Sequence, residues 1–237
     1  MRSPLEIIAH RGFSQIAPEN TIAAFKAALE HNADGVEFDV QLSADGIPVV
    51  IHDPTLNRTT NGRGKVASKT LAELKALEAG NWFTPLFVGE KIPTFQEVLD
   101  LFKDSEVKLY AEVKQAHLWQ ENHIEQFVTT IVSQGWQHRC IVASFDADFL
   151  NKIDDSHLTV GYHVSKSSEY AKKLNYAVAR NSAILLCEYS LLLKHSDLIA
   201  IARQQSVDIV AWTVDKKEDL ERLTQRNITR IITNALL

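Results

Sequence analysis

Three acidic residues in two strand-like segments are the strongest candidates for chemistry in this sequence. Glu37 and Asp39 alternate with apolar residues in the segment 35–40, so both carboxylates lie on one face of an extended strand. Glu112 belongs to a second such segment, residues 110–114. A buried carboxylate normally needs an opposite charge or a metal ion. Three carboxylates at one place suit a hard divalent cation such as Mg²⁺ or Ca²⁺.

Two histidines and two basic residues stand at comparable positions, at or near the ends of strand-like segments. His10 is followed directly by Arg11, and His52 follows the return of the chain after an Asp-Gly turn at 45–46. Histidines suit acid–base work near neutral pH. Arg11 and Lys114 supply fixed positive charge, which suits a phosphate. Together with a metal ion, these groups indicate phosphoryl chemistry.

Each of these residues also has an ordinary structural interpretation. A Glu-x-Asp pattern occurs on solvated strand faces, and Lys114 could simply neutralise Glu112 on the same face. Trp212, near the end of the seventh expected strand, suits the wall of a substrate site as well as a packed core. A metal-dependent lyase or aldolase could use similar carboxylates. The paired histidines together with Arg11 favour phosphodiester cleavage.

The elements that must position these residues alternate between strand and helix. Counting from the strand at 6–9, the pattern gives about eight βα units, the number of a TIM (β/α)8 barrel. A doubly wound open sheet is the alternative. From residue 94 onward, strands are expected at 107–113, 140–145, 158–163, 183–187, 207–214 and 230–233, and helices at 94–102, 121–134, 147–153, 168–179, 197–205 and 217–226.

Residues 54–91 interrupt this alternation. They begin with a turn-rich stretch at 57–64 and are too long for a simple βα loop. We interpret them as an insertion within a single catalytic domain, residues 1–237, containing one short helix within 68–77. We expect the insertion to cover the barrel mouth.

Asn20 is the expected N-cap of a helix over residues 21–30, which precedes the insertion.

Composition places the chain among ordinary globular proteins. It has 237 residues, 45% of them hydrophobic and 23% charged, and a net charge of −5, so no broad cationic surface for nucleic acid or acidic lipid is indicated. The N-terminal residues do not resemble a signal peptide, and no apolar run approaches the roughly 20 residues that span a bilayer. Cys140 and Cys187 lack metal-motif spacing. We interpret them as reduced thiols of a cytoplasmic protein, with a single disulfide as the alternative.

Several short motifs follow one another in a characteristic order along the chain. They are His10-Arg11-Gly12, Pro18-Glu19-Asn20-Thr21, Gly35-Val36-Glu37-Phe38-Asp39-Val40, Asp45-Gly46, His52-Asp53, Arg58-Thr59-Thr60-Asn61-Gly62, Ile92-Pro93-Thr94, Glu112-Val113-Lys114, Ser144-Phe145 and Trp212-Thr213-Val214. Over nearly its whole length the sequence thereby resembles the glycerophosphodiester phosphodiesterases.

The resemblance implies a TIM barrel that hydrolyses glycerophosphodiesters to sn-glycerol 3-phosphate and an alcohol, with one divalent cation, Mg²⁺ or Ca²⁺. By position it makes His10 and His52 the catalytic pair, Arg11 and Lys114 phosphate-binding residues, and Glu37, Asp39 and Glu112 the metal ligands. The expected partner is a small water-soluble substrate, with neither nucleic acid nor stable membrane association. A phospholipase-like activity on intact lipids is the neighbouring alternative. Head group and oligomeric state stay open.

The C-terminal residues depart from the family pattern. The family commonly ends with Thr-Asp-x-Pro, whereas this chain reads Thr233-Asn234-Ala235-Leu236. We expect the departure to leave the catalytic positions untouched. The first nucleophile stays open between water and the substrate's own 2-hydroxyl, with a slight preference for the hydroxyl because its attack is intramolecular.

Overall fold

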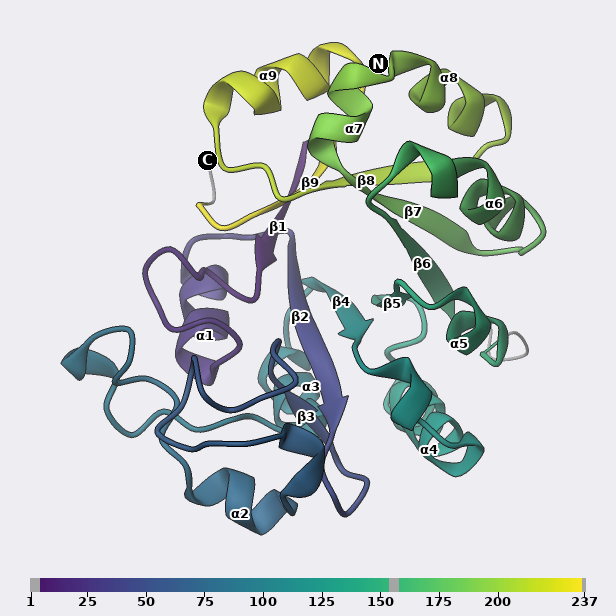
Figure 1. Ribbon diagram of the computed structural model, residues 1–237. Coiled ribbons are helices and arrows are strands. Elements are labelled where there is room, and N and C mark those ends of the chain that lie inside the picture. The colour runs from purple at the N-terminus through teal and green to yellow at the C-terminus, as the bar shows by residue number, and fades with distance from the viewer. Residues whose placement is uncertain (1–4, 154–157, 236–237) are drawn as a thin grey trace.

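The computed structural model describes residues 5–153 and 158–235 as a closed barrel of eight parallel strands surrounded by helices (Figure 1). Strand β1 pairs with β2 on one side and β9 on the other, which closes the sheet and confirms the TIM barrel over the open alternative. The parallel strands are β1 (Glu6–His10), β2 (Gly35–Leu42), β4 (Lys108–Val113), β5 (Cys140–Ser144), β6 (Thr159–Val164), β7 (Ala183–Glu188), β8 (Asp208–Trp212) and β9 (Arg230–Thr233).

The helices lie outside the strands and mostly match the expected ranges (Figure 1). They are α1 (Ile22–Glu30), α2 (Leu71–Ala76), α3 (Phe95–Phe102), α4 (Glu121–Ser133), α5 (Ala147–Asn151), α6 (Ser167–Val178), α7 (Tyr189–Lys194), α8 (Ser196–Gln204) and α9 (Lys217–Gln225). Helix α7 was not expected. It begins directly after β7 because the Glu188 side chain accepts hydrogen bonds from the backbone N–H groups of Ser190 and Leu191. In the described residues, no helix is both long and apolar enough to cross a membrane.

Strand β2 carries a short antiparallel partner, β3 (Pro48–Val50), which returns the chain toward the barrel mouth. Residues 54–91 then form a hydrogen-bonded loop, the 3-10 turns η1 (Val66–Ser68) and η2 (Pro85–Phe87), and α2, which lies within the range predicted for a short helix. A separate apolar cluster holds this segment against β3. Its buried members are Val49, Ile51, Leu56, Val66, Leu74, Ala79 and Ile92.

The barrel interior is apolar in its middle and polar at both ends. Ile8, Ile141, Ile184, Leu186, Val210 and Ile232 fill the middle together with Tyr110 and Ala143. At the N-terminal end of the strands, the Tyr110 hydroxyl donates to Glu6 at 2.6 Å and accepts from Arg230. Lys108 also donates to Glu6, at 2.8 Å. These paired charges close the end of the barrel opposite the candidate site.

The polar closure should contribute to stability through its hydrogen bonds. Replacing Tyr110 by Phe leaves Glu6 and Arg230 partly buried without their shared partner, which should cost about 1–3 kcal/mol of unfolding free energy. Urea unfolding would measure the loss. Tyr176→Phe, on outer helix α6, is the control and should change stability by less than about 0.5 kcal/mol. Equal stability of the two variants would contradict this role for Tyr110.

Candidate active site

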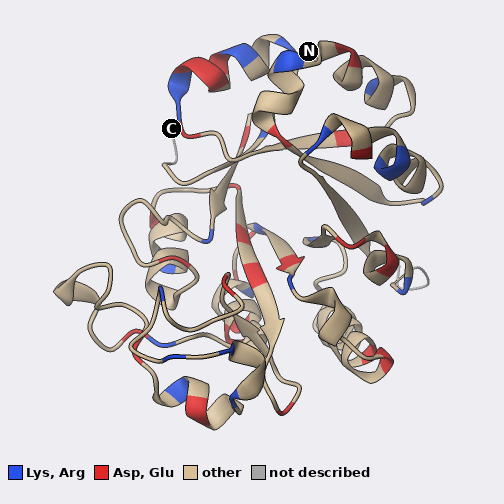
Figure 2. Ribbon diagram, viewed as in Figure 1, with Lys and Arg blue, Asp and Glu red and all other residues tan. Residues whose placement is uncertain are grey.

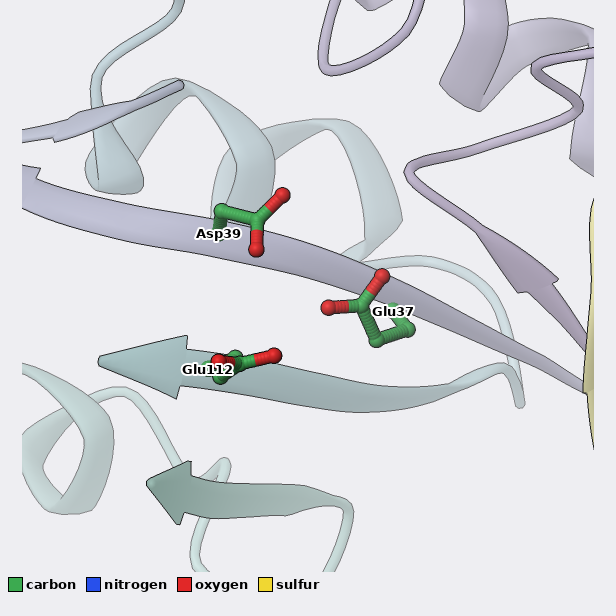
Figure 3. A group of neighbouring side chains, drawn as sticks. All are labelled: Glu37, Asp39 and Glu112. Atoms are coloured by element: carbon green, nitrogen blue, oxygen red, sulfur yellow. The ribbon is translucent and has the colours of Figure 1, made fainter. Parts of the chain in front are cut away.

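The three acidic side chains predicted to act together meet at the C-terminal ends of two adjacent strands. Glu37 and Asp39 come from β2, and Glu112 comes from β4, where it is paired in register with Asp39 (Figure 3). Figure 2 shows acidic segments in red on both of these strands. Each offers one carboxylate oxygen, and these three oxygens lie within 4.8 Å of one another. The residues are only 2%, 1% and 6% exposed. The period-two alternation thus places all three carboxylates at one buried point.

Two cations approach this acidic cluster. Lys114 Nζ lies 2.6 Å from Glu112 Oε1 and 3.1 Å from Asp39 Oδ1. Arg11 Nε lies 3.3 Å from Asp39 Oδ2, and the Arg11 backbone N–H donates to Glu37 Oε2 at 3.1 Å. Lys114 therefore does partly neutralise the acids, as the structural interpretation allows. Three ionised carboxylates against two cations would still leave one excess negative charge.

The pKa values of Glu37 and Asp39 are shifted in opposite directions by this environment. Burial raises the pKa of Glu37 well above its usual range, and the neighbouring Asp39 and Glu112 raise it further. Burial also acts to raise the pKa of Asp39, but Lys114 and Arg11 outweigh it and hold that pKa well below its usual range. The two cations therefore stabilise the ionised form of Asp39 but not that of Glu37.

The donor set fits a divalent metal ion. All of its atoms are carboxylate oxygens, which hard cations such as Mg²⁺ and Ca²⁺ prefer. Asp39 Oδ1 and Glu112 Oε1 accept no well-directed hydrogen bond from any described residue, although Lys114 lies close to both. A cation held by Glu37, Asp39 and Glu112 would use these oxygens and offset the excess charge.

His10 is partly buried at the end of β1 and held by the C-terminal segment. Its Nδ1 lies 2.8 Å from Asn234 Oδ1, while the Asn234 amide nitrogen donates to Asp215 at 2.8 Å. Because Asp215 fixes the amide orientation, His10 Nδ1 must carry the proton and donate it to the carbonyl oxygen. Burial is the main cause that lowers the pKa of His10 to about 4, and the positive charge of Arg11 lowers it further. His10 is therefore a neutral imidazole, and its Nε2 lies 3.7 Å from Glu37.

The expectation that the unusual C-terminal residues leave the catalytic positions untouched is wrong. Asn234, which stands where the family commonly has an acid, contacts His10 directly. The physical reason is the closure of the barrel: β9 pairs with β1, so the residue after β9 lies beside the end of β1.

His52 is fixed through both its side chain and its backbone. Its Nδ1 lies 2.7 Å from Asp53 Oδ1. Hydrogen bonds from Arg58 keep the pKa of Asp53 well below its usual range, so this carboxylate is ionised and must accept the proton of Nδ1. The amide nitrogen of Gln41 lies 2.9, 2.9 and 2.7 Å from the carbonyl oxygens of Ile51, His52 and Asp53. The segment that carries His52 is thereby tied to β2.

A cavity of about 180 Å³ joins these groups. Its far wall is aromatic: Phe145 stacks on His163 with ring centroids 4.5 Å apart, and Trp212 meets both rings edge-on. His163 is 3% exposed, and its Nε2 lies 3.3 Å from Glu112 Oε2. The residues lining the cavity are His10, Arg11, Glu37, His52, Glu112, Lys114, Phe145, His163, Trp212, Thr213 and Ile232. All of the sequence-derived candidates except Asp39 line it, and Asp39 lies directly behind.

Two polar residues beside the acids were not recognised as part of the site. Asn20 was expected to cap α1, but Thr21 is the cap, and Asn20 instead donates to Asp39 Oδ2 at 2.8 Å. The structure corrects that expectation. Gln41, which holds the His52 segment, was missed altogether. It continues the alternation of Glu37 and Asp39 along β2, so the period of the strand could have revealed it.

Comparisons with known proteins agree with this geometry. The model of the glycerophosphoryl diester phosphodiesterase family matches residues 10–237. A glycerophosphodiester phosphodiesterase of Caldanaerobacter subterraneus subsp. tengcongensis is 38% identical over 96% of this chain and 93% of its own length.

Solved structures show the same similarity. A phosphodiesterase of Oleispira antarctica, in complex with the product sn-glycerol-3-phosphate, is 29% identical with a TM-score of 0.84, covering 97% of this chain and 93% of that one. A glycerophosphodiester phosphodiesterase of Agrobacterium tumefaciens strain C58 is 25% identical with a TM-score of 0.83, covering 98% of each chain.

The contact between His10 and Asn234 can be tested by changing the charge of the partner. Asn234→Asp places an anion beside His10, which favours the imidazolium and should raise the pKa of His10 by about 1 or more. NMR titration of the imidazole in EDTA would measure it. The exposed Asn227→Asp, at the other end of β9, is the matched control and should leave the titration unchanged. An unchanged His10 pKa in Asn234→Asp would contradict the contact.

Proposed function

The chain belongs to the glycerophosphoryl diester phosphodiesterase family, and we propose that it hydrolyses glycerophosphodiesters to sn-glycerol 3-phosphate and an alcohol. The observation that carries the proposal is the meeting of three carboxylates, two histidines and two cations at one cavity. Such a set can bind a phosphodiester and move two protons. The product complex of the Oleispira antarctica relative supports a small glycerol phosphate ester as the ligand.

We propose that Glu37, Asp39 and Glu112 hold one divalent cation, Mg²⁺ or Ca²⁺. Their oxygen-only donor set and the excess negative charge that the three residues would carry when all are ionised support this assignment. When bound, the ion supplies positive charge that stabilises a reacting phosphate and favours loss of a proton from a nearby hydroxyl. Arg11 and Lys114 then act as the fixed cations for the phosphate oxygens, and Trp212 forms part of the substrate wall.

The two histidines are proposed to divide the proton transfers between them. His10 faces a neutral amide and is itself neutral, so its Nε2 is available to accept a proton as general base. His52 donates its Nδ1–H to the ionised Asp53, and we assign it the role of general acid toward the departing alcohol. Different partners on the two Nδ1 atoms are the basis of this division.

We propose that the first nucleophile is the substrate's 2-hydroxyl. His10 takes the hydroxyl proton, the new P–O bond closes a cyclic phosphate, and His52 protonates the oxygen of the leaving alcohol. Water then opens the ring, with the histidines exchanging roles, to give sn-glycerol 3-phosphate. An internal nucleophile can lower the barrier by roughly 7–11 kcal/mol relative to a bimolecular encounter. Direct attack by water uses the same residues and is the alternative.

Residues 54–91 are proposed to be an insertion within a single catalytic domain that shapes access for the head group. One feature of this segment favours a second candidate activity, cleavage of intact lipids. At η2 the side chains of Leu86 and Val88 are 91% and 65% exposed, which suits contact with acyl chains. Faster turnover of lysophospholipid micelles than of glycerophosphocholine would favour this second activity.

We further propose a cytoplasmic location. The support is that Cys140 and Cys187 are both free thiols buried in separate strands, β5 and β7, as expected in a reducing compartment.

The activity and its metal dependence can be tested together. Purified protein should release glycerol 3-phosphate from glycerophosphocholine or glycerophosphoethanolamine, and EDTA should abolish the release. Glu37→Gln keeps the shape of the side chain but removes its charge. Its affinity for Mg²⁺ or Ca²⁺, measured by calorimetry, should fall by at least about 100-fold. Loss of a residue that only hydrogen-bonds to a metal ligand costs up to about 100-fold, and loss of a ligand should cost at least as much. The exposed Glu106→Gln is the control. Full activity of Glu37→Gln in EDTA would rule out the metal role.

The nucleophile is tested with a glycerophosphodiester that lacks only the 2-hydroxyl. The internal route predicts that this analogue competes with the normal substrate but is not cleaved, because its nucleophile is gone. Product release and the inhibition constant would be measured side by side. Turnover of the analogue at a near-normal rate would identify water as the first nucleophile.

A further inference from the structure

Arg58, in the segment 54–91, binds two carboxylates at once. Its Nε and Nη2 donate to Asp53 Oδ2 and Oδ1 at 2.8 and 2.9 Å. Its Nη1 and Nη2 donate to Glu19 Oε2 and Oε1 at 2.7 and 2.8 Å. Four of the five guanidinium N–H donors are therefore used in two bidentate contacts, the geometry that gives arginine–carboxylate pairs their directional specificity.

Each of these carboxylates also contacts a residue that lines the cavity. Asp53 Oδ1, which accepts from Arg58, lies 2.7 Å from His52 Nδ1. Glu19 Oε1, which accepts from Arg58 as well, accepts from Arg11 Nη1 at 2.8 Å. A continuous chain of contacts thus runs from His52 through Asp53, Arg58 and Glu19 to Arg11. Arg58 is its centre and the only member that lies within residues 54–91.

The backbone that carries Arg58 is itself held in place. Leu56 and Val66, on either side of it in the sequence, are fully buried in the apolar cluster of this segment. The loop between them is closed on itself, because the Leu56 N–H donates to the Gly64 carbonyl at 2.9 Å and the Val66 N–H donates to the Pro54 carbonyl at 3.0 Å. The Arg58 guanidinium therefore extends from a fixed base.

We propose that Arg58 is a positioning residue that fixes His52 and Arg11 relative to each other through Asp53 and Glu19. The segment 54–91 then braces the reacting groups of the barrel mouth in addition to shaping access to it. The inference rests on the proposed phosphodiesterase function for the roles of His52 and Arg11. The contacts themselves do not depend on that function.

The expected consequence lies in catalysis more than in stability. The Arg58 side chain is 44% exposed, and exposed ion pairs contribute little to folding. A small displacement of a reacting group, in contrast, can reduce a rate strongly: a misplacement of about 1 Å can cost about 10²-fold. A lysine cannot replace Arg58, because a single ammonium cannot make two bidentate contacts.

Kinetics of Arg58 variants test the proposal. In Arg58→Ala we expect kcat for glycerophosphoethanolamine to fall by about 10²-fold with a smaller change in KM and an almost unchanged melting temperature. Guanidinium chloride, far below denaturing concentration, should restore part of kcat, whereas sodium chloride at equal ionic strength should not. Arg63→Ala, an exposed arginine of the same loop, is the matched control and should behave like the parent.

A second measurement reads the position of His52 without any turnover. The imidazole nitrogen signals of His52, assigned by their absence in His52→Gln, should show a protonated Nδ1 in the parent. In Arg58→Ala they should shift toward a mixture of tautomers, because Asp53 is no longer held. An inactive parent would overturn the proposed function, whereas the nitrogen signals would still decide whether Arg58 positions His52.

The outcomes separate positioning from a merely structural role. A folded Arg58→Ala with kcat within a few-fold of the parent and unshifted His52 signals would overturn the proposal. So would a loss of activity that follows a lowered melting temperature and is not restored by guanidinium. Should Arg58→Ala fail to fold, Arg58→Lys decides: the proposal predicts a kcat at least about tenfold lower than the parent, and parent-like kinetics would overturn it.

Discussion

The structure is organised around the cost of burying three carboxylates at one point. Glu37, Asp39 and Glu112 lie in an otherwise apolar barrel, and the parallel pairing of β2 with β4 places Asp39 beside Glu112. Neither strand can move these side chains apart without losing its register, since a shift by one residue turns the whole row to the other face. The repulsion is therefore met by what surrounds the acids: cations, oriented N–H groups and, in our proposal, a metal ion.

The backbone of the first βα connection is shaped so that Arg11 can contact the buried carboxylates. Arg11 has a left-handed φ of +56°, which ends β1 so that its backbone N–H meets Glu37 while its side chain meets Asp39 and Glu19. Gly12 continues the turn with φ +77°, and a Cβ there would lie 2.6 Å from the backbone carbon of Ala24. The His-Arg-Gly triplet thus combines an imidazole, a cation with two points of attachment, and a turn that admits no side chain.

The features that depend on local periodicity could be predicted from the sequence. The features that depend on contacts between distant segments could not. The alternation in β2, the Glu112–Lys114 pair and the number of βα units are local patterns, and all three led to the right architecture. Asn20 and Thr21 are both good N-cap residues, however, and in the structure Thr21 caps α1 while the side chain of Asn20 donates to the distant Asp39. Helix α7 was missed because its cap, Glu188, directly follows the strand that was expected at 183–187, with no loop between them.

Asn234 is the clearest case of information that no local pattern contains, because its partner is 224 residues away in the sequence. Its effect is an asymmetry between two otherwise similar histidines. Both donate Nδ1–H to an oxygen and keep Nε2 for the cavity, but one oxygen belongs to a neutral amide and the other to an ionised carboxylate. We propose that these unequal partners divide the two proton transfers of the reaction, with His10 accepting a proton and His52 giving one.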